Sequence, residues 1–308
     1  MPIRSRYKTI NDVLREEFGE KVSKISVDGG MSCPNLDGTI SSDGCIYCLN
    51  GSHYGKNSIR VLTVEKQLLN GIAYIRNVKP QMNKFIAYFQ AHSNTYADTD
   101  YLKRIYEEAL AIDQIVGLSI ATRPDCLNRE KIELLKTISQ KKYLWLELGL
   151  ESMHNKTLAS INRGHTFETF RESVIMAQEA GIRVCAHTIL YLPGEKRKDI
   201  LQTATALAEL KVDGVKLHHL HLLKRTKLYD IHQSGNVFLP TLQEYVQTVV
   251  DFIERLPPDT VIHRVAGDAP KDLLVAPDWS GNKLRIINEV KKEFKDRGSY
   301  QGRRYGAY

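Results

Sequence analysis

The feature that most constrains the fold is an alternation of short apolar runs with longer amphipathic stretches. Strands are predicted at 24–27, 84–90, 115–122, 143–150, 182–192 and 214–223. Helices are predicted between them at 63–77, 99–111, 129–139, 155–161, 167–180 and 198–210. Nearly continuous apolar strands separated by amphipathic helices are typical of a parallel sheet covered by helices.

A barrel is the better prediction for this sheet. The first strand is not followed by G-x-G-x-x-G, which disfavours a dinucleotide-binding doubly wound sheet. We therefore predict a partial or complete parallel (β/α) barrel over 24–240, preceded by an N-terminal helix within 1–23. The C-terminal extension, 241–308, is expected to pack on the barrel in a single domain. It has predicted helices at 242–256 and 283–294 and a short strand within 261–270. Its tail from residue 296 lacks apolar periodicity and is expected to be mobile or ordered by a partner.

The composition indicates a basic protein without a membrane segment. Lys and Arg total 43 against 36 Asp and Glu, which gives a net charge of +7 and a pI of about 9.0. A positive charge of this size suits a polyanionic partner. No run of about 18 apolar residues and no signal-peptide pattern occurs, so we expect a soluble, cytoplasmic protein.

Three of the five cysteines lie in one turn-rich loop. Cys33, Cys45 and Cys48 form a C-x11-C-x2-C pattern interrupted by Gly, Pro, Asn and Asp residues. Disulfides are disfavoured, because the cysteine count is odd and no secretion signal precedes the loop. Two metal sites are compatible with the spacing. One is a structural zinc site with His53 as the fourth ligand, and the other is a four-iron cluster with one iron left open.

Polar residues mark the predicted carboxyl ends of the strands. In a parallel barrel these ends converge on one mouth, where working residues gather. Alternation on the last strand places Lys216 and His218 on one face and His219 and His221 on the other. One pair should face the barrel interior, and histidines of the cleft or core are a better interpretation than a zinc site.

The loop, with its C-x-Y-C ending, resembles that of radical S-adenosylmethionine (SAM) enzymes. The segments IATRPDCL (120–127), ELGLESMHNKTLASINRGHT (147–166), CAHTILYLPGE (185–195) and LHHLHLLKRTKLYDIHQSG (217–235) resemble, in the same order, the radical domain of the Elongator catalytic subunit. The eleven-residue cysteine interval differs from the usual C-x3-C-x2-C, and no acetyltransferase domain is expected. The segment CPNLDGT is more similar to the stand-alone bacterial family called YtqA or MnmL.

This resemblance implies a reaction and its cofactors. A [4Fe–4S] cluster held by the three loop cysteines would bind SAM at its fourth iron and cleave it with one electron. The resulting radical would take hydrogen from the C5 side chain of the tRNA wobble uridine. The product would be 5-aminomethyl(2-thio)uridine, made from 5-carboxymethylaminomethyl(2-thio)uridine. Implied partners are the tRNA anticodon region and an electron donor such as flavodoxin or ferredoxin.

The resemblance also suggests roles for individual residues. Cofactor contacts are expected from Tyr47 (adenine), Gln90 (amino group), Glu147 or Glu151 (ribose) and Arg163 (carboxylate). Substrate contact or catalysis is expected from Arg123, His187, Lys216 and His218. Phosphate contacts are expected from Lys224, Arg225, Lys227, Arg303 and Arg304. Each role has a plain alternative. Tyr47 would pack the loop as an aromatic side chain, and Glu151 would be an acid in the first turn of a helix. Arg163 and the residues of the phosphate contacts would be solvated surface charges.

Two other functions fit the sequence. The first is radical chemistry on a small metabolite or a protein, which leaves the basic surface unexplained. The second is a zinc-stabilised RNA-binding barrel without catalytic activity, which predicts a colourless protein that contains zinc and no iron.

Overall fold

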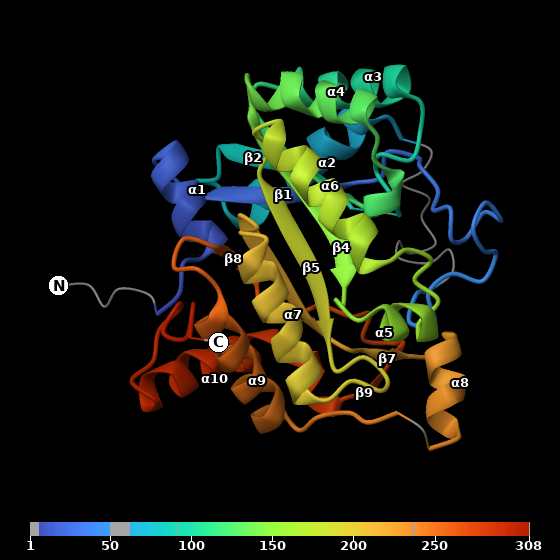
Figure 1. The fold of residues 1–308 in the computed structure, drawn as a ribbon. Helices are drawn as coiled ribbons and strands as arrows, with labels where there is room; N and C mark the ends of the chain where they lie inside the picture. Colours follow the sequence, from blue (N-terminus) through green and yellow to red (C-terminus); the bar gives the residue numbers. More distant parts are fainter. Residues whose placement is uncertain (1–5, 50–61, 91, 236, 308) are drawn as a thin grey trace.

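Seven parallel strands form a curled half-barrel, as predicted (Figure 1). The computed structural model describes residues 6–49, 62–90, 92–235 and 237–307. In spatial order the strands are β1 (Val22–Val27), β2 (Lys84–Phe89), β3 (Ile115–Thr122), β4 (Tyr143–Glu151), β5 (Val184–Leu190), β6 (Gly214–His219) and β8 (Val261–Arg264). Their carboxyl ends lie at one mouth of the half-barrel, and this common edge positions the site.

Helices between successive strands cover the outside of the sheet (Figure 1). They are α2 (Val64–Val78), α3 (Thr99–Leu110), α4 (Arg129–Ser139), α6 (Phe167–Glu179) and α7 (Arg197–Glu209). The short helix α5 (Asn155–Ser160) lies instead beyond the carboxyl end of β4, toward the mouth. Several begin at polar residues that cap them: the Asn128 side chain accepts from Lys131 N, and that of Thr166 accepts from Thr169 N. These caps fix the residues at which the helices begin.

The N-terminal helix α1 (Ile10–Phe18) closes the end of the half-barrel opposite the mouth. Its Ile10 and Leu14 pack with Trp145, Tyr143 and Val261 of the strands in one apolar cluster. Ile262 N of β8 donates a hydrogen bond to the carbonyl of Lys8, just before the helix, at 2.8 Å. This helix therefore contacts both outer strands of the sheet, β1 and β8.

The predicted strand at 214–223 is wrong in its second half. β6 ends at His219, where its pairing with β5 ends at Leu190. The chain then turns, and β7 (Leu222–Leu223) pairs antiparallel with β9 (Leu274–Ala276) in a separate ribbon. The sequence of this run does not reveal the break, because β6 and β7 are both buried and therefore both apolar. The short helix α8 (Lys227–Gln233) follows and was not predicted.

The C-terminal extension contains α9 (Leu242–Arg255) and α10 (Lys283–Asp296) at nearly the predicted bounds. β8 lies beyond residue 240 but joins the main sheet beside β6. The domain boundary at residue 240 stays a prediction. No helix of the described residues is long and apolar enough to cross a membrane.

The tail was predicted to be mobile or ordered by a partner, and through residue 307 this is wrong, because other parts of the same chain hold it. Ser299 Oγ donates to Glu254 Oε1 at 2.5 Å, and Arg304 forms an ion pair with the same carboxylate at 2.9 Å. Gln301 is 6% exposed and donates to the carbonyl of Thr260 at 2.7 Å. These contacts are polar. The prediction relied on apolar periodicity, which does not detect contacts of this kind.

Candidate active site

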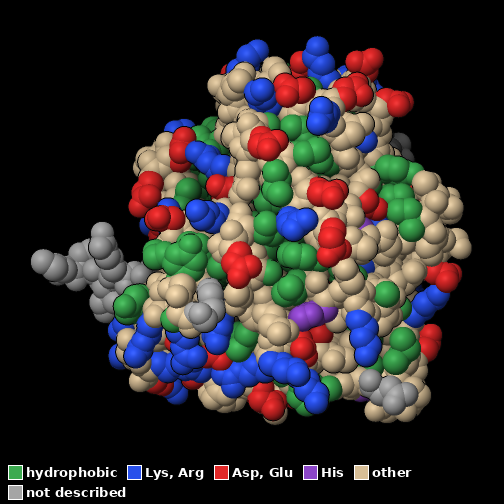
Figure 2. Space-filling view, in the orientation of Figure 1, with side chains coloured by type: hydrophobic (Ala, Val, Ile, Leu, Met, Phe, Trp, Pro, Cys, Tyr) green, Lys and Arg blue, Asp and Glu red, His purple; other side chains and the backbone are tan. Residues whose placement is uncertain are grey.

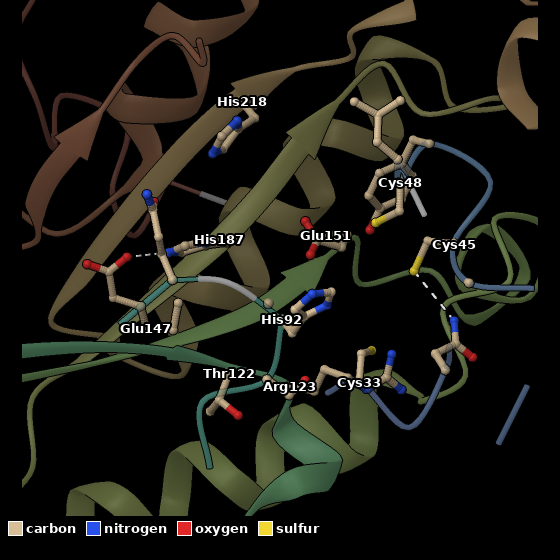
Figure 3. A pocket seen from close by; sticks show the side chains of 18 of the residues that line it. Cys33, Cys45, Cys48, His92, Thr122, Arg123, Glu147, Glu151, His187 and His218 are labelled. Atoms are coloured by element: carbon tan, nitrogen blue, oxygen red, sulfur yellow. Dashed lines mark hydrogen bonds and ion pairs between the residues drawn. The ribbon is translucent and has the colours of Figure 1, made fainter. Parts of the chain in front are cut away.

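A cavity of about 580 Å³ opens at the mouth of the half-barrel, between the cysteine loop and the strand ends (Figure 3). Eleven of the twelve predicted site residues line it: Cys33, Cys45, Tyr47, Cys48, Gln90, Arg123, Glu147, Glu151, Arg163, His187 and His218. The twelfth, Lys216, lies beside Glu147 and is buried. The structure thus brings together residues that are up to 185 positions apart in the sequence, from Cys33 to His218.

The cysteine loop is held against the turn that follows α5. The Asn35 side chain donates to the carbonyl of Asn162 at 2.6 Å, and Ile46 N donates to the carbonyl of Ile161 at 3.1 Å. Ile46 also packs among Leu158 and Ile161 in a small apolar cluster. These contacts orient the loop so that all three cysteines line the cavity.

Cys45 lies in a polar, positively charged environment. Its Sγ is 3.7 Å from Arg163 Nη1 and 3.6 Å from Asn35 Nδ2. A hydrogen bond from the Cys48 thiol, together with the Arg163 charge, holds the pKa of Cys45 well below its usual value despite burial. The same hydrogen bond, with burial, raises the pKa of Cys48. A thiolate is the form of cysteine that binds metal.

The donor set fits a [4Fe–4S] cluster with a polar cofactor beside it. Three thiols in one loop supply the ligands. Buried polar atoms of five lining residues have no hydrogen-bond partner among the described residues: Asn35 Oδ1, Tyr47 Oη, Ser93 Oγ, Arg163 Nε and Arg264 Nε. Within the described ranges, no three His, Cys, Asp or Glu side chains are arranged to hold a single metal ion. His53, the fourth ligand of the zinc hypothesis, lies outside those ranges.

Arg163 joins the cysteine loop to the end of β4. Its Nη2 donates to the carbonyl of Gly149 at 2.9 Å and lies 3.3 Å from Glu151 Oε1. Burial raises the pKa of Glu151 to about 7, against the lowering effect of Arg163. The guanidinium of Arg163 was expected to bind a cofactor carboxylate, but its Nη2 already contacts Gly149 and Glu151. Its Nε has no hydrogen-bond partner among the described residues.

Gly149 leaves room for this arginine, which gives a test of its position. A Cβ at residue 149 would lie 2.3 Å from Arg163 Nη2 and 2.9 Å from Glu151 Oε1. Both atoms end flexible side chains, so we expect Gly149→Ala to move Arg163 away from Cys45 and to leave the fold intact. SAM cleavage should fall about tenfold, equivalent to about 1.4 kcal/mol, with the thermal midpoint within a few degrees of wild type. Full activity in 5′-deoxyadenosine assays would show that the position of Arg163 is unimportant.

Glu147 is the centre of a buried charge network, and Figure 3 shows its contact with His187. Its Oε1 accepts from Lys24 at 2.8 Å and from Ser119, and its Oε2 accepts from Lys216 at 2.5 Å and from His187 at 2.6 Å. Although burial alone raises the pKa of a carboxyl, the two ammonium groups hold that of Glu147 well below its usual value. Four protein donors occupy its oxygens, so the expected ribose contact suits Glu151 better than Glu147.

Arg123 is also already engaged by the protein. Its Nε and Nη2 form a two-point contact with Asp125 at 2.9 and 2.7 Å, and Nη1 donates to the carbonyl of Arg163 at 2.8 Å. The guanidinium fork expected to bind substrate is thus directed at Asp125. Its evident effect is to fix the turn that carries Arg163.

The contact expected of Gln90 with the cofactor's amino group stays a prediction. Gln90 Nε2 donates to Ser26 Oγ at 2.5 Å, which leaves the carbonyl oxygen as the acceptor for an amino group.

The polar side chains of β6 lie on two opposite faces, as alternation along a strand predicts. Lys216 contacts Glu147, and His218 lines the cavity. His219 lies on the opposite face against Trp279, with ring centroids 4.9 Å apart, and also contacts His221.

Arg264 is a site residue that the sequence analysis missed. It ends β8, lines the cavity and donates from Nη2 to His218 Nδ1 at 2.9 Å. The sequence predicted a short strand within 261–270 but not that it ends at Arg264, so the residue was not recognised as a strand-end residue.

The predicted phosphate contacts are exposed residues, and some of them have protein partners. Lys227 pairs with Asp43 at 2.7 Å, and Arg304 with Glu254 at 2.9 Å. Lys224, Arg225 and Arg303 are also exposed.

The chain is similar to known proteins over nearly its whole length. The family described as "Radical SAM superfamily" matches residues 39–207, so Cys33 lies just before the match, and "Radical_SAM C-terminal domain" matches 212–296. The uncharacterized protein YtqA of Bacillus subtilis is 42% identical over 301 residues, which are 97% of this chain and 92% of that protein. Human Elongator complex protein 3 is 28% identical over 62% of this chain and 34% of its own length.

A solved structure shares the fold. The archaeal Methanocaldococcus infernus Elp3 with an N-terminal deletion superposes with a TM-score of 0.71 at 17% identity. The match covers 91% of this chain and 64% of that one. The cysteine loop, the half-barrel and these similarities agree, and the chain belongs to the radical SAM superfamily, as an iron–sulfur enzyme that uses a [4Fe–4S] cluster and SAM.

Proposed function

We propose that this enzyme modifies the C5 side chain of the tRNA wobble uridine, converting 5-carboxymethylaminomethyl(2-thio)uridine to 5-aminomethyl(2-thio)uridine. The resemblance of its motifs to the Elongator catalytic subunit and to the stand-alone bacterial family supports this substrate. A cytoplasmic location and reduction by flavodoxin or ferredoxin are part of the same proposal.

The observation that carries the proposal is the division of the cavity into two ends. Figure 3 shows the cysteines on one side and Glu147, His187 and His218 on the other. When bound, the cluster supplies the electron that cleaves SAM to a 5′-deoxyadenosyl radical, which removes hydrogen from an unactivated carbon. The second end is polar and rich in cationic groups. It therefore suits a small, charged side chain presented by a nucleotide.

The protein's own groups organise this reaction. Arg163 and the Tyr47 hydroxyl, which has no hydrogen-bond partner in the part of the chain that the structure describes, offer donors at the cysteine end, and Gln90 offers an acceptor. The buried network around Glu147 fixes the opposite wall. A fixed polar wall orients the substrate carbon and excludes water from a reactive intermediate.

The surface supports a polyanionic substrate. Figure 2 shows Lys and Arg side chains gathered on the lower part of the displayed face, over α9 and α10. The exposed basic residues of α10 are Arg285, Lys291, Lys292 and Lys295. Clustered positive charge binds nucleic acid without sequence preference and in a salt-dependent way. A small-metabolite substrate would have no use for this charge.

The test is an anaerobic assay with two tRNAs. Protein reconstituted with iron and sulfide is mixed with SAM, dithionite and tRNA bearing carboxymethylaminomethyluridine, or the same tRNA with unmodified uridine. We expect 5′-deoxyadenosine formation coupled to loss of the carboxymethyl group with the first tRNA only. Complex formation should weaken steeply with salt. Cleavage of SAM without any change in the tRNA would refute the substrate and favour a metabolite or protein.

A further inference from the structure

Three arginines line the cavity, and they differ in their partners. Arg123 is paired with Asp125, and Arg163 with Glu151. Arg264 has no carboxylate within ion-pair distance among the described residues, and its Nε has no hydrogen-bond partner there. A buried guanidinium without an anion is costly, because its desolvation is not offset by an opposite charge. Arg264 is thus the lining arginine whose fork is open to a ligand.

His218 adds a second donor beside this arginine. Arg264 Nη2 donates to His218 Nδ1 at 2.9 Å, so that nitrogen is an acceptor and the proton lies on Nε2. Burial, with the nearby charge of Arg264, lowers the pKa of His218 well below its usual value, so the ring is neutral near pH 7. The ring lines the cavity (Figure 3), where its Nε2–H remains available as a donor.

The backbone is shaped to keep these two groups together. Gly267 follows β8, and a Cβ there would lie 2.7 Å from His218 Nδ1 and 3.0 Å from His221 Cε1. Any larger residue would push the imidazole away from the arginine. The close approach therefore depends on glycine at this position.

The two acids nearest Arg264, Glu147 and Asp268, favour its charged form, but each also forms ion pairs with lysines. Glu147 is engaged by Lys24 and Lys216, which balance its charge. Asp268 lines the cavity but pairs with Lys283 at 2.5 Å. Among the described residues this wall therefore carries an unpaired positive charge, and its complement is an anionic group of the substrate.

We propose that Arg264 and His218 form a subsite that binds the carboxylate of the substrate, which on the proposed function is the carboxylate of the carboxymethylaminomethyl side chain. A planar guanidinium fork and an adjacent N–H match the two oxygens of a carboxylate. The product amine has no such group, so the subsite discriminates substrate from product and favours product release.

The test measures binding separately from turnover. The probes are an anticodon stem-loop with carboxymethylaminomethyluridine and the same stem-loop with the carboxylate converted to its amide, which has nearly the same size. Fluorescence anisotropy compares wild type, Arg264→Gln, Arg264→Lys and the exposed control Arg171→Gln on α6. We expect wild type and the control to prefer the carboxylate by about tenfold or more, which corresponds to about 1.4 kcal/mol. Arg264→Gln should lose this preference, and Arg264→Lys should keep part of it.

The outcomes separate this subsite from the proposed function. If wild type binds both probes equally, or neither, the subsite is wrong, and the same holds if Arg264→Gln keeps the full preference. Turnover of the carboxylate substrate despite equal binding leaves the proposed function standing without the subsite. A wild-type preference that Arg264→Gln abolishes, without any turnover, supports the subsite and refutes the proposed reaction. If Arg264→Gln fails to fold, the wild-type comparison and Arg264→Lys still decide.

Discussion

Replacement of Cys45 by alanine should abolish SAM cleavage while the half-barrel remains folded. Cys45 is buried at the edge of the cavity, and its thiolate is stabilised by the Cys48 thiol and by Arg163. A cluster deprived of one of three protein ligands cannot keep its place beside SAM. We expect 5′-deoxyadenosine formation to fall by about 10³-fold or more, equivalent to a barrier increase of about 4 kcal/mol.

The measurement combines three readouts. Iron and sulfide content after reconstitution should fall, 5′-deoxyadenosine should drop to background, and the circular dichroism spectrum should match wild type. Cys126→Ala is the matched control, because Cys126 is a buried cysteine outside the loop. It should keep its iron and its activity. Undiminished 5′-deoxyadenosine formation by Cys45→Ala would refute the cluster assignment.

Replacement of Glu147 by glutamine should cause the largest loss of stability among single substitutions at the site. The carboxylate is fully buried, and Lys216, with its side chain 8% exposed, depends on it as a counter-ion. Removing one partner of a buried ion pair leaves the other charge uncompensated and costs about 3–5 kcal/mol. We expect the free energy of unfolding in urea at about pH 7 to fall by that amount.

The loss should depend on pH in a defined direction. The folded pKa of Glu147 is depressed, so its contribution is full above the ordinary value of 4.5 and is lost only as the pH falls through the depressed value. Burial lowers the pKa of Lys216 from 10.5 to about 8. Lys216 therefore binds its proton more tightly in the unfolded chain than in the folded protein. As the pH rises, Lys216 of the folded protein loses its charge, and the cost of burying that charge without Glu147 disappears. The difference between wild type and Glu147→Gln should therefore shrink between about pH 7 and about pH 9.

An exposed carboxylate provides the control. The side chain of Glu133 is 67% exposed and pairs only with Lys136 on the surface of α4 among the described residues. Glu133→Gln should change the stability by less than about 0.5 kcal/mol at every pH. A difference between wild type and Glu147→Gln that stays below about 1 kcal/mol, or grows toward alkaline pH, would show that the network around Glu147 does not stabilise the fold.

The sequence predicted the half-barrel and the helices well, because periodicity and caps are local signals. Residues 115–122 and 129–139 agree with β3 and α4 at both ends. Residues 214–223 were read as one strand because burial hides the turn after His219. The tail was misjudged because polar contacts such as Ser299 with Glu254 leave no hydrophobic pattern.

Site membership was also predictable, but the partners of each side chain were not. The strand-end rule and the motifs selected residues that do line the cavity. They could not show that Asp125 occupies the fork of Arg123, or that two lysines surround Glu147. Arg264 was overlooked because its significance depends on what it fails to contact. Contacts that join distant segments are set by tertiary geometry, which a single sequence does not display.

The closure beneath the cavity joins the two ends of the chain. Lys8 N donates to the side chain of Gln301, 293 residues away, and Ile262 N donates to the carbonyl of Lys8. During translation α1 emerges from the ribosome long before β8 and the tail exist. Its apolar side can contact Tyr143 and Trp145 earlier, but the hydrogen bonds of Lys8 with Ile262 and Gln301 form only after those later segments have been made. The position of α1 is therefore completed late in synthesis.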